Sequence, residues 1–439
     1  MTNNYINVVG AGLAGCEAAY QIAKRGIPVR LFDMKPNKKS AAHHSENFAE
    51  LVCSNSLKAQ RTSSAAGLLK EEMRMLDSLL LKCADKCMVP AGGALAVDRD
   101  IFSQLVTDEI KSMDNIEIVS KEITEIPDDA ITVIATGPLT ADTLCSEIVS
   151  LLGGSLSFFD AAAPIVTAES IDPKTSFAQS RYDKGDGDDY INCPLNKAEY
   201  EVFYSALINA ERAPLHDFDV SDPKVYEGCM PIEVMAQRGE DTIRFGPMKP
   251  VGLRDPRTGH RPWACLQLRR ENADGTMYNL VGFQTNLKFP EQKRVFGLIP
   301  ALKDAEFVRY GVMHRNTFID SPRVLSSDYS AKCNPDLFFA GQLTGVEGYM
   351  ESASSGLIAG INAANRYLGK ETILLPKETM IGALVRYITD ETVVKFQPMG
   401  ASFGLLPELQ DRPRDKKLRG EKYAQRAIDA LNLYKTERL

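Results

Sequence analysis

The sequence lacks any long apolar run, and no stretch approaches the roughly 20 apolar residues that a membrane-spanning helix needs. Its first five residues are polar, and glycines interrupt the short apolar run that follows. A secretory leader has a longer, uninterrupted apolar centre behind a basic start. We therefore expect a cytoplasmic protein that neither crosses a membrane nor is anchored in one.

Cysteine is scarce as well, with nine residues in a chain of 439 and no CxxC pair. This number is too low for a disulfide scaffold in a chain of this length. Cys83 and Cys87 are spaced to share one face of a helix, but no further Cys or His pair lies nearby to complete a zinc site. We expect no metal, and most of the thiols should be small buried side chains.

Positive charge is also in deficit, since 51 Lys and Arg face 58 Asp and Glu, for a net charge of −7. This balance excludes a surface coated in positive charge, although a local basic face is enough to bind nucleic acid. The composition is otherwise that of a globular protein, 44% hydrophobic and 25% charged. The length predicts two or three domains.

The clearest positive feature is a glycine-rich turn between two short β-rich runs. Residues 5–9 form the first run, the turn reads GAGLAG, an alanine-rich helix follows, and Asp33 ends the second run. This order is that of a dinucleotide-binding βαβ unit, in which the helix N-terminus faces the phosphates and the acidic residue binds ribose. The predicted cofactor contacts here are Gly10, Ala11, Gly12, Leu13, Ala14, Gly15 and Asp33.

The second half of such a site is expected much later in the chain. A predicted strand at residues 131–135 leads into Thr136-Gly137, and another at 337–341 (LFFAG) also ends in glycine. A glycine-rich loop and a helix over residues 353–367, rich in small side chains, come next. This late strand, loop and helix favour FAD as the dinucleotide. The further predicted contacts are Gly137, Gly341, Gln342, Gly345 and Gly348.

These motifs predict an α/β fold, in which a Rossmann-type FAD-binding domain, glutathione-reductase-like, is interrupted by an α+β insertion domain. One helix is expected over residues 67–82, and the insertion is expected to contain few helices. The expected bounds are 1–156 and 331–375 for the two parts of the FAD-binding domain, 157–330 for the insertion, and 376–439 for a C-terminal helical segment with a basic tail.

Two cysteines and one basic stretch are candidates for chemistry. Cys53 lies in LVCSNS, and Cys229 lies between a glycine and Met-Pro, although an unreactive buried thiol is the commoner fate of any single cysteine. Basic residues around Trp263 fit two interpretations equally well, an RNA-binding face or a solvated charged face over core aromatics. The candidate RNA contacts are Arg254, Arg257, Arg261 and Arg294.

In nine segments the chain closely resembles the folate- and FAD-dependent tRNA (uracil-5-)-methyltransferases, the TrmFO family. The segments follow one another in order up to about residue 365, and the part after about residue 373 matches less distinctively. They are residues 10–19 (GAGLAGCEAA), 53–56 (CSNS), 93–99 (GALAVDR), 135–140 (ATGPLT), 226–233 (YEGCMPIE), 244–253 (RFGPMKPVGL), 278–287 (YNLVGFQTNL), 306–318 (EFVRYGVMHRNTF) and 339–350 (FAGQLTGVEGYM).

The resemblance implies methylation at C5 of the T-loop uridine in tRNA, with 5,10-methylenetetrahydrofolate as the carbon source. It implies that Cys229 adds to uracil C6, that Cys53 is the base at C5, and that reduced FAD relays and reduces the methylene. Thiolate addition at C6 makes the poorly nucleophilic C5 reactive. NADPH or NADH would reduce the flavin, and no obligate protein partner is evident.

Three alternatives stay open. The same chemistry could act on a uridine of ribosomal RNA. The related flavoprotein that builds carboxymethylaminomethyl groups on wobble uridine shares the fold and the use of folate, but it is longer and has a distinct C-terminal helical domain. A non-catalytic, RNA-binding flavoprotein is the third alternative.

Overall fold

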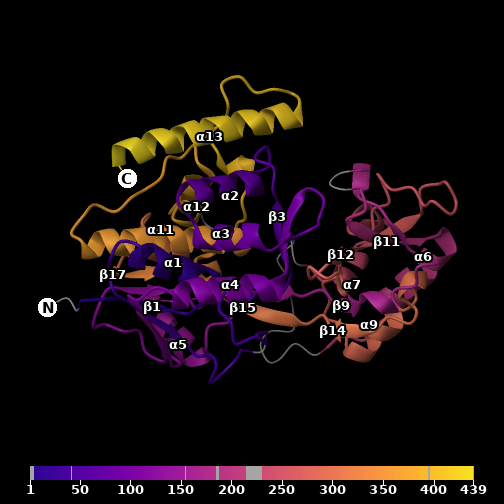
Figure 1. Ribbon diagram of the computed structural model, residues 1–439, viewed down its shortest axis with the longest axis horizontal. Coiled ribbons are helices and arrows are strands. Elements are labelled where there is room, and N and C mark those ends of the chain that lie inside the picture. The colour runs from indigo at the N-terminus through magenta and orange to yellow at the C-terminus, as the bar shows by residue number, and fades with distance from the viewer. Residues whose placement is uncertain are drawn as a thin grey trace.

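The computed structural model describes residues 4–40, 42–153, 155–183, 187–213, 230–393 and 396–438. Two six-stranded sheets dominate it, and Figure 1 shows them in two halves that lie side by side. The half on the left holds the mostly parallel sheet and both ends of the chain. The half on the right holds the antiparallel sheet of the insertion.

The parallel sheet combines strands from two distant parts of the chain. Its order is β16-β17-β7-β1-β2-β6, and only β16 runs antiparallel to its neighbour. The four residues of β1 are all buried, as expected for a strand covered on both faces. The strands are β1 (Ile6–Val9), β2 (Val29–Asp33), β6 (Ile116–Ser120), β7 (Thr132–Ile134), β16 (Ser330–Ala331) and β17 (Asn334–Phe339).

Two helices of small residues cross closely over one face of this sheet, α1 (Leu13–Ala23) and α11 (Tyr349–Tyr367). A methyl group on Gly356 would lie 2.1 Å from the carbonyl oxygen of Ala14, so only glycine permits this approach. The predicted late helix is therefore confirmed, and its small side chains allow contact with α1. The helix begins at Tyr349, earlier than residue 353, because the backbone turns into it directly after Gly348.

The single helix expected over residues 67–82 is wrong. The chain forms α2 (Ala65–Met75) and α3 (Leu79–Lys86), separated by Asp77, whose φ is +64°. The Ser78 side chain accepts a hydrogen bond from the Leu81 N–H group and so caps α3. The next helix, α4 (Arg99–Lys111), is capped in the same way by Asp98.

The antiparallel sheet of the insertion has the order β10-β11-β12-β13-β9-β14. The insertion was expected to contain few helices, but its described residues form five short ones, four beside the sheet and the fifth, α10 (Ser321–Val324), near its end. The strands are β9 (Ile165–Thr167), β10 (Phe177–Ala178), β11 (Tyr190–Leu195), β12 (Ala264–Arg270), β13 (Met277–Leu280) and β14 (Phe307–Arg309). The helices are α6 (Lys197–Ile208), α7 (Ile232–Ala236), α8 (Glu240–Phe245) and α9 (Phe289–Phe296).

Shorter elements surround and join the two sheets. β8 and β15 pair antiparallel where the chain enters and leaves the insertion, and β3, β4 and β5 form a small sheet beside α2. The bounds are β3 (Ser56–Ala59), β4 (Met88–Val89), β5 (Ala94–Val97), α5 (Asp142–Leu152), β8 (Ser155–Ala161), β15 (Met313–Ile319) and α10 (Ser321–Val324).

The C-terminal segment folds back over the first half. α12 (Met380–Ile388) confirms the predicted helix, and the expected basic tail leads into α13 (Lys416–Arg438), a 23-residue helix that lies across the top in Figure 1. A methyl group on Gly420 would lie 2.2 Å from the Ser63 carbonyl oxygen, so α13 touches the loop before α2. None of the described helices is long and apolar enough to cross a membrane.

Candidate functional site

The glycine turn between β1 and α1 has the geometry expected of a dinucleotide cradle. Gly10 adopts φ +101°, and a methyl group on Gly15 would lie 1.7 Å from the Gly10 carbonyl oxygen. A methyl group on Gly12 would meet no atom within 4 Å, so this residue faces open space at the helix N-terminus. No side chain caps α1, which leaves its first N–H groups available to an anion.

Asp33, predicted from the sequence to bind ribose, makes hydrogen bonds within the glycine turn. Its two carboxylate oxygens accept hydrogen bonds from the N–H groups of Ala11 (2.7 Å) and Lys35 (2.9 Å). The carboxylate therefore shapes the glycine turn and also lines the cleft beside it. The same cleft is lined by Gly10, Gly12, Phe32, Lys121, Thr136 and Thr140.

The glycines from the late part of the chain reach the same helix. A methyl group on Gly341 would lie 3.1 Å from the Ala14 side chain, and the Gly341 N–H group donates to Ser355 Oγ at 2.7 Å. Gln342 donates to Glu347, and Gly345 and Gly348 lead into α11 with positive φ. Leu13 and Ala14 lie in the first turn of α1, and Gly137 follows β7. These residues fit a dinucleotide laid along the end of the parallel sheet.

Cys53 lies beside Tyr349, the first residue of α11. The Tyr349 hydroxyl accepts hydrogen bonds from the N–H groups of Cys53 (2.8 Å) and Ser54 (3.1 Å), and it lies 2.9 Å from Cys53 Sγ. Because these two N–H groups occupy both lone pairs of the Tyr349 oxygen, the hydroxyl proton is directed to Cys53 Sγ, and the tyrosine donates that hydrogen bond. Burial raises the pKa of Tyr349 well above its usual value, so it remains a donor.

Side chains from the insertion hold the loop that carries Cys53. The buried guanidinium of Arg269, in β12, donates to Asn55 Oδ1 and Ser54 Oγ, both at 2.8 Å. The Asn55 amide donates in return to the carbonyl oxygens of Arg270 (3.0 Å) and Glu271 (3.3 Å). The candidate thiol is therefore fixed by contacts between the two halves of the molecule.

A buried ion pair adds to this junction. Arg99, at the start of α4, donates to the Leu51 carbonyl oxygen at 2.7 Å and pairs with Glu271. The side chains of Arg99 and Glu271 are 13% and 3% exposed. Burial raises the pKa of Glu271, while the nearby guanidinium groups of Arg99 and Arg269 act against that rise.

The other described cysteines have different surroundings. Cys16, Cys83, Cys87, Cys193 and Cys265 are buried, and burial raises the pKa of Cys83 and of Cys87 to about 12. This confirms the expectation that most thiols are buried. No cluster of metal-ligating side chains occurs among the described residues. Cys229 lies outside the described residues.

The basic stretch of the insertion gathers around Trp263. The Arg244 guanidinium carbon lies 3.8 Å from the centre of the Trp263 ring, and the Lys197 ammonium nitrogen lies 5.6 Å from it. Arg254 and Arg261 are exposed on the neighbouring loop. This arrangement combines cations with an aromatic ring at one cleft, whose lining also includes the carboxylates of Glu199 and Asp255. The other lining residues include Asn196, Lys197, Arg244, Arg257, His260, Arg261 and Trp263.

Two of the four arginines predicted to contact RNA are already paired with carboxylates. Arg257 binds Asp255 through Nε (3.0 Å) and Nη2 (2.7 Å), and Arg294 binds Glu291 through Nε (2.8 Å) and Nη2 (2.7 Å). Arg294 also lies on α9, apart from the residues that line the Trp263 cleft. Of the four candidates, Arg257 and Arg261 line this cleft, whereas Arg254 and Arg294 do not.

Sequence reasoning missed the residues that surround Cys53. Tyr349 and Arg99 lie inside motifs that the sequence analysis quoted, but no spacing rule connects either of them with Cys53. Tyr349 is 296 positions away in the chain, and Arg269 is 215 positions from Ser54. Only an alignment of co-varying positions or a structure could have revealed these contacts.

Comparisons with known proteins give consistent results. A family model described as "Glucose inhibited division protein A" matches residues 5–371. The relative from Acetivibrio thermocellus is 60% identical over 432 residues, which are 98% of each chain. Those from Lactobacillus acidophilus and Brevibacillus brevis are 58% and 56% identical over 98% and 100% of each chain. All three are named methylenetetrahydrofolate--tRNA-(uracil-5-)-methyltransferase TrmFO.

The fold is also that of solved structures. GidA from Aquifex aeolicus superposes with a TM-score of 0.69 in one crystal form and 0.67 in another, at 17% identity. The match covers 98% and 99% of this chain, and 73% and 78% of the GidA chains. At this identity the likeness establishes the fold alone, a Rossmann-type FAD-binding α/β domain interrupted by an insertion.

Proposed function

The chain belongs to the TrmFO family of methylenetetrahydrofolate–tRNA-(uracil-5-)-methyltransferases, and from this premise we propose that it methylates C5 of the T-loop uridine in tRNA. The observation that carries the proposal is identity of 56–60% with relatives of that name over at least 98% of the chain. The carbon would come from 5,10-methylenetetrahydrofolate, with NADPH or NADH as the reductant.

FAD fits the cradle between β1 and α1. Gly12 leaves room for a pyrophosphate at the uncapped N-terminus of α1, and Asp33 lines the cleft where ribose hydroxyls would bind. Gly341 and the loop to Gly348 would hold the far end of the cofactor. When bound, FAD supplies the reducing equivalents that turn a methylene into a methyl group.

Cys53 is proposed as the base that removes the C5 proton of the substrate uracil. A base must be a thiolate at the moment of proton transfer, and a hydrogen bond donated to sulfur favours that form. The Tyr349 hydroxyl lies 2.9 Å from Cys53 Sγ, where it can donate this hydrogen bond. The guanidinium of Arg269 fixes the same loop by donating a hydrogen bond to Ser54 Oγ. The tyrosine acts here as a positioning residue, since it acts through the sulfur.

Cys229 is proposed as the nucleophile at uracil C6. Its sulfur would form a bond to C6, and the electron pair of the C5–C6 double bond would then make C5 able to attack the one-carbon unit. Loss of the C5 proton to Cys53 would expel the carrier nitrogen from the one-carbon unit, with the bonding electron pair, and leave a methylene on C5. A hydride supplied by the reduced cofactor would add to this methylene, and the C6–S bond would break to release the Cys229 thiolate and restore the C5–C6 double bond. The support is the family motif YEGCMPIE, since Cys229 lies outside the described residues.

The Trp263 cleft is proposed as part of the RNA-binding face. Exposed Arg254 and Arg261 can contact phosphates, and the aromatic ring with its neighbouring cations suits an unpaired base. Arg257 and Arg294 are weaker members of this face, because Asp255 and Glu291 already neutralise them.

The test is a methylation assay with purified protein, methylenetetrahydrofolate and NADPH, on unmodified tRNA and on ribosomal RNA fragments side by side. We expect a yellow protein that methylates a T-loop uridine of tRNA. Methylation of the ribosomal fragment alone would transfer the activity to that substrate. No methyl transfer to either RNA would overturn the enzymatic proposal.

A second test separates the two cysteines. Wild-type protein and the Cys53→Ala variant should form a gel-stable adduct with tRNA that contains 5-fluorouridine, because fluorine blocks the removal step at C5. The Cys229→Ala variant should form none. An adduct that persists in Cys229→Ala would place the C6 nucleophile elsewhere.

A further inference from the structure

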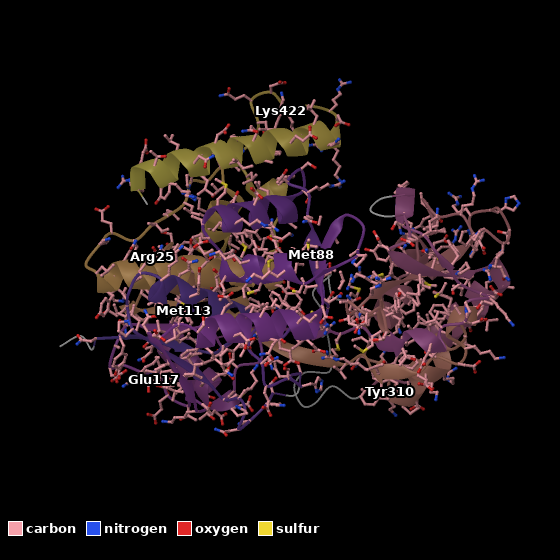
Figure 2. All side chains as sticks on the ribbon, viewed as in Figure 1. Arg25, Met88, Met113, Glu117, Tyr310 and Lys422 are labelled. Atoms are coloured by element: carbon pink, nitrogen blue, oxygen red, sulfur yellow. The ribbon has the colours of Figure 1, made fainter. Side chains whose placement is uncertain are left out.

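The strand that follows Cys53 contains a lysine in a backbone conformation that suits glycine. Lys58, in β3, has φ +64°, and the register of β3 against β5 shifts there between Ser56 and Ala59. A Cβ atom makes this left-handed region unfavourable, whereas glycine adopts it without that cost. Figure 2 places Met88, from the same small sheet, on the side of the first half that faces the insertion. A lysine kept in this conformation points to a function of its side chain.

The Lys58 side chain forms an ion pair with Glu351, in the first turn of α11. The distance from Nζ to Oε1 is 2.8 Å, and the side chain of Glu351 is 1% exposed while that of Lys58 is 49% exposed. Two residues earlier in α11, the Tyr349 hydroxyl accepts a hydrogen bond from the Cys53 N–H group. The first turn of α11 therefore holds the segment from Cys53 to Lys58 at both of its ends.

Both charged groups of this pair lie against the backbone of the late cofactor loop. A methyl group on Gly348 would come within 2.2 Å of Glu351 Oε2 and 2.6 Å of Lys58 Nζ. The Lys58 ammonium also donates to the Glu347 carbonyl oxygen at 3.4 Å. Gly348 is one of the residues predicted to contact FAD, and it directly precedes α11. The pair thus connects the strand that follows Cys53 with the loop that would hold the far end of the cofactor.

The C-terminal segment reaches the same carboxylate. The Ala401 N–H group donates to Glu351 Oε1 at 3.0 Å. Two residues earlier, Met399 makes two backbone hydrogen bonds with the cofactor loop: it donates to the Gly345 carbonyl oxygen (3.0 Å) and accepts from the Glu347 N–H group (2.8 Å). Three segments that are far apart in the sequence therefore meet at Glu351.

The carboxylate of Glu351 is buried with one oxygen unused. Its Oε2 accepts no hydrogen bond from the described residues. Burial of such an oxygen is unfavourable, and a neutral side chain of the same size would avoid it. Two other charged residues are neighbours: Glu347 accepts a hydrogen bond from the Gln342 amide, and the buried Lys70 ammonium, which also interacts with Glu351, donates to two backbone carbonyl oxygens. Lys58 is thus the cation that forms the hydrogen-bonded ion pair with Glu351.

We propose that Glu351 and Lys58 are positioning residues of the methylation reaction, and that their ion pair holds the strand of Cys53 against the cofactor loop at Gly348. The inference rests on the proposed function for the roles of Cys53 and FAD. The pair acts through the strand and the loop and not on a reacting atom. Without the pair, the segment after Cys53 can move away from α11, and the sulfur then loses the hydrogen bond from Tyr349.

The experiment compares two holoenzyme variants with the wild type: Glu351→Gln alone, and Glu351→Gln together with Lys58→Gly. The single change keeps the volume. The double variant has neither the disfavoured lysine conformation nor the buried carboxylate, so its Tm should not fall. We expect kcat for tRNA methylation to fall about tenfold in both, with unchanged KM for tRNA and unchanged FAD content. The second change should add nothing to the first, because both remove the same pair.

A second readout needs no methyl transfer. The rate at which iodoacetamide alkylates Cys53, followed by mass spectrometry of its peptide, gives the pH midpoint of the thiol. If the strand moves away from Tyr349, the thiolate loses a hydrogen-bond donor, and the midpoint should rise in both variants. Removal of the Glu351 charge by itself would lower the midpoint, so a rise reports the displacement of the strand.

Two further variants are controls. Lys58→Arg keeps the positive charge and should retain most of the wild-type kcat. Asp77→Gly is the matched control, because Asp77 has the same φ of +64° and is paired with Lys24 and Lys82, but lies between α2 and α3. It relieves the backbone and breaks ion pairs away from the cofactor loop, so kcat and the Cys53 midpoint should not change.

The outcomes separate positioning from a structural role and from RNA binding. An unchanged kcat in either variant, or an unchanged Cys53 midpoint, would overturn the inference. So would a Tm of the double variant that falls with kcat, since the pair would then only support the fold, and a raised KM for tRNA, which would make Lys58 an RNA contact. Wild-type protein that methylates no RNA would overturn the proposed function, and the alkylation midpoint would still decide whether the pair positions Cys53.

Discussion

The two halves of the molecule are held at their critical points by different kinds of contact. Around α1, backbone lies directly on backbone: a methyl group would come within 1.7 Å of a carbonyl oxygen at Gly15 and within 2.1 Å of one at Gly356. At the junction with the insertion, charged side chains of Arg99, Arg269 and Glu271 make the contacts. The first region should therefore be sensitive to added volume, and the second to the removal of charge.

The largest expected effect tests the sensitivity to volume. Gly15→Ala should destabilise the protein by more than about 4 kcal/mol or prevent folding, because its methyl group would overlap the Gly10 carbonyl oxygen. Thermal unfolding and the flavin absorbance per protein measure the result. Gly12→Ala is the matched control: it has room for the methyl group, so it should fold normally and lose FAD affinity. A Gly15→Ala protein with a native Tm would contradict the comparison.

The next effect tests the sensitivity to charge. Glu271→Gln keeps the volume but leaves the buried guanidinium of Arg99 without its partner, which should cost about 3–5 kcal/mol of unfolding free energy. Glu291→Gln breaks a pair with Arg294 at the surface of the same half and should cost no more than about 1 kcal/mol. Urea unfolding measures the loss of unfolding free energy in each variant. Equal losses would show that burial of the junction pair is unimportant.

The third effect concerns Tyr349, whose loss should change the free energy of unfolding little and the methylation rate strongly. Tyr349→Phe should lower the methylation rate about 100-fold, because Cys53 Sγ loses a hydrogen-bond donor. FAD content should be retained. Tyr387→Phe removes a hydroxyl that donates to the Gln397 carbonyl oxygen and should leave the rate unchanged. If Tyr349→Phe turns over normally, the tyrosine has no part in positioning the thiol.

The smallest effect concerns the outer face of the insertion. Arg261→Ala should raise the Kd for tRNA a few-fold and reduce the slope of log Kd against log salt by about 0.7–0.9, the value for one phosphate contact. Arg294→Ala should change the slope less, since Glu291 already pairs with that guanidinium. Filter binding at several salt concentrations measures both. A larger slope change in Arg294→Ala would move the RNA-binding face toward α9.

Much of the fold could be predicted from sequence because its signals are local. The strand, turn and helix around Gly10 lie within 30 residues, and the Ala11 N–H group meets Asp33 only 22 positions later. The bounds of a helix were predicted wrongly where the conformation of one residue changed the direction of the backbone. Asp77, at φ +64°, divides a continuous helical pattern into α2 and α3, and hydrophobic periodicity does not register such a break.

The candidate site was predictable only as separate residues. Cys53 was singled out by its motif, but its surroundings depend on Tyr349 and Arg269, which the topology brings from distant strands and helices. The predicted RNA contacts show the same limit. Composition gave no means of knowing that two of the four exposed candidates, Arg257 and Arg294, are paired with carboxylates.

By itself, the sequence determined the kind of cofactor cradle, the interruption of its domain by an insertion, and the family, because glycine geometry and motif order are properties of short segments. The tertiary structure decided what surrounds Cys53 and which cations are neutralised. It also decided that Lys58 and Glu351, 293 positions apart, form an ion pair against Gly348. Those properties depend on distances between side chains far apart in the chain, and a linear pattern does not contain such distances.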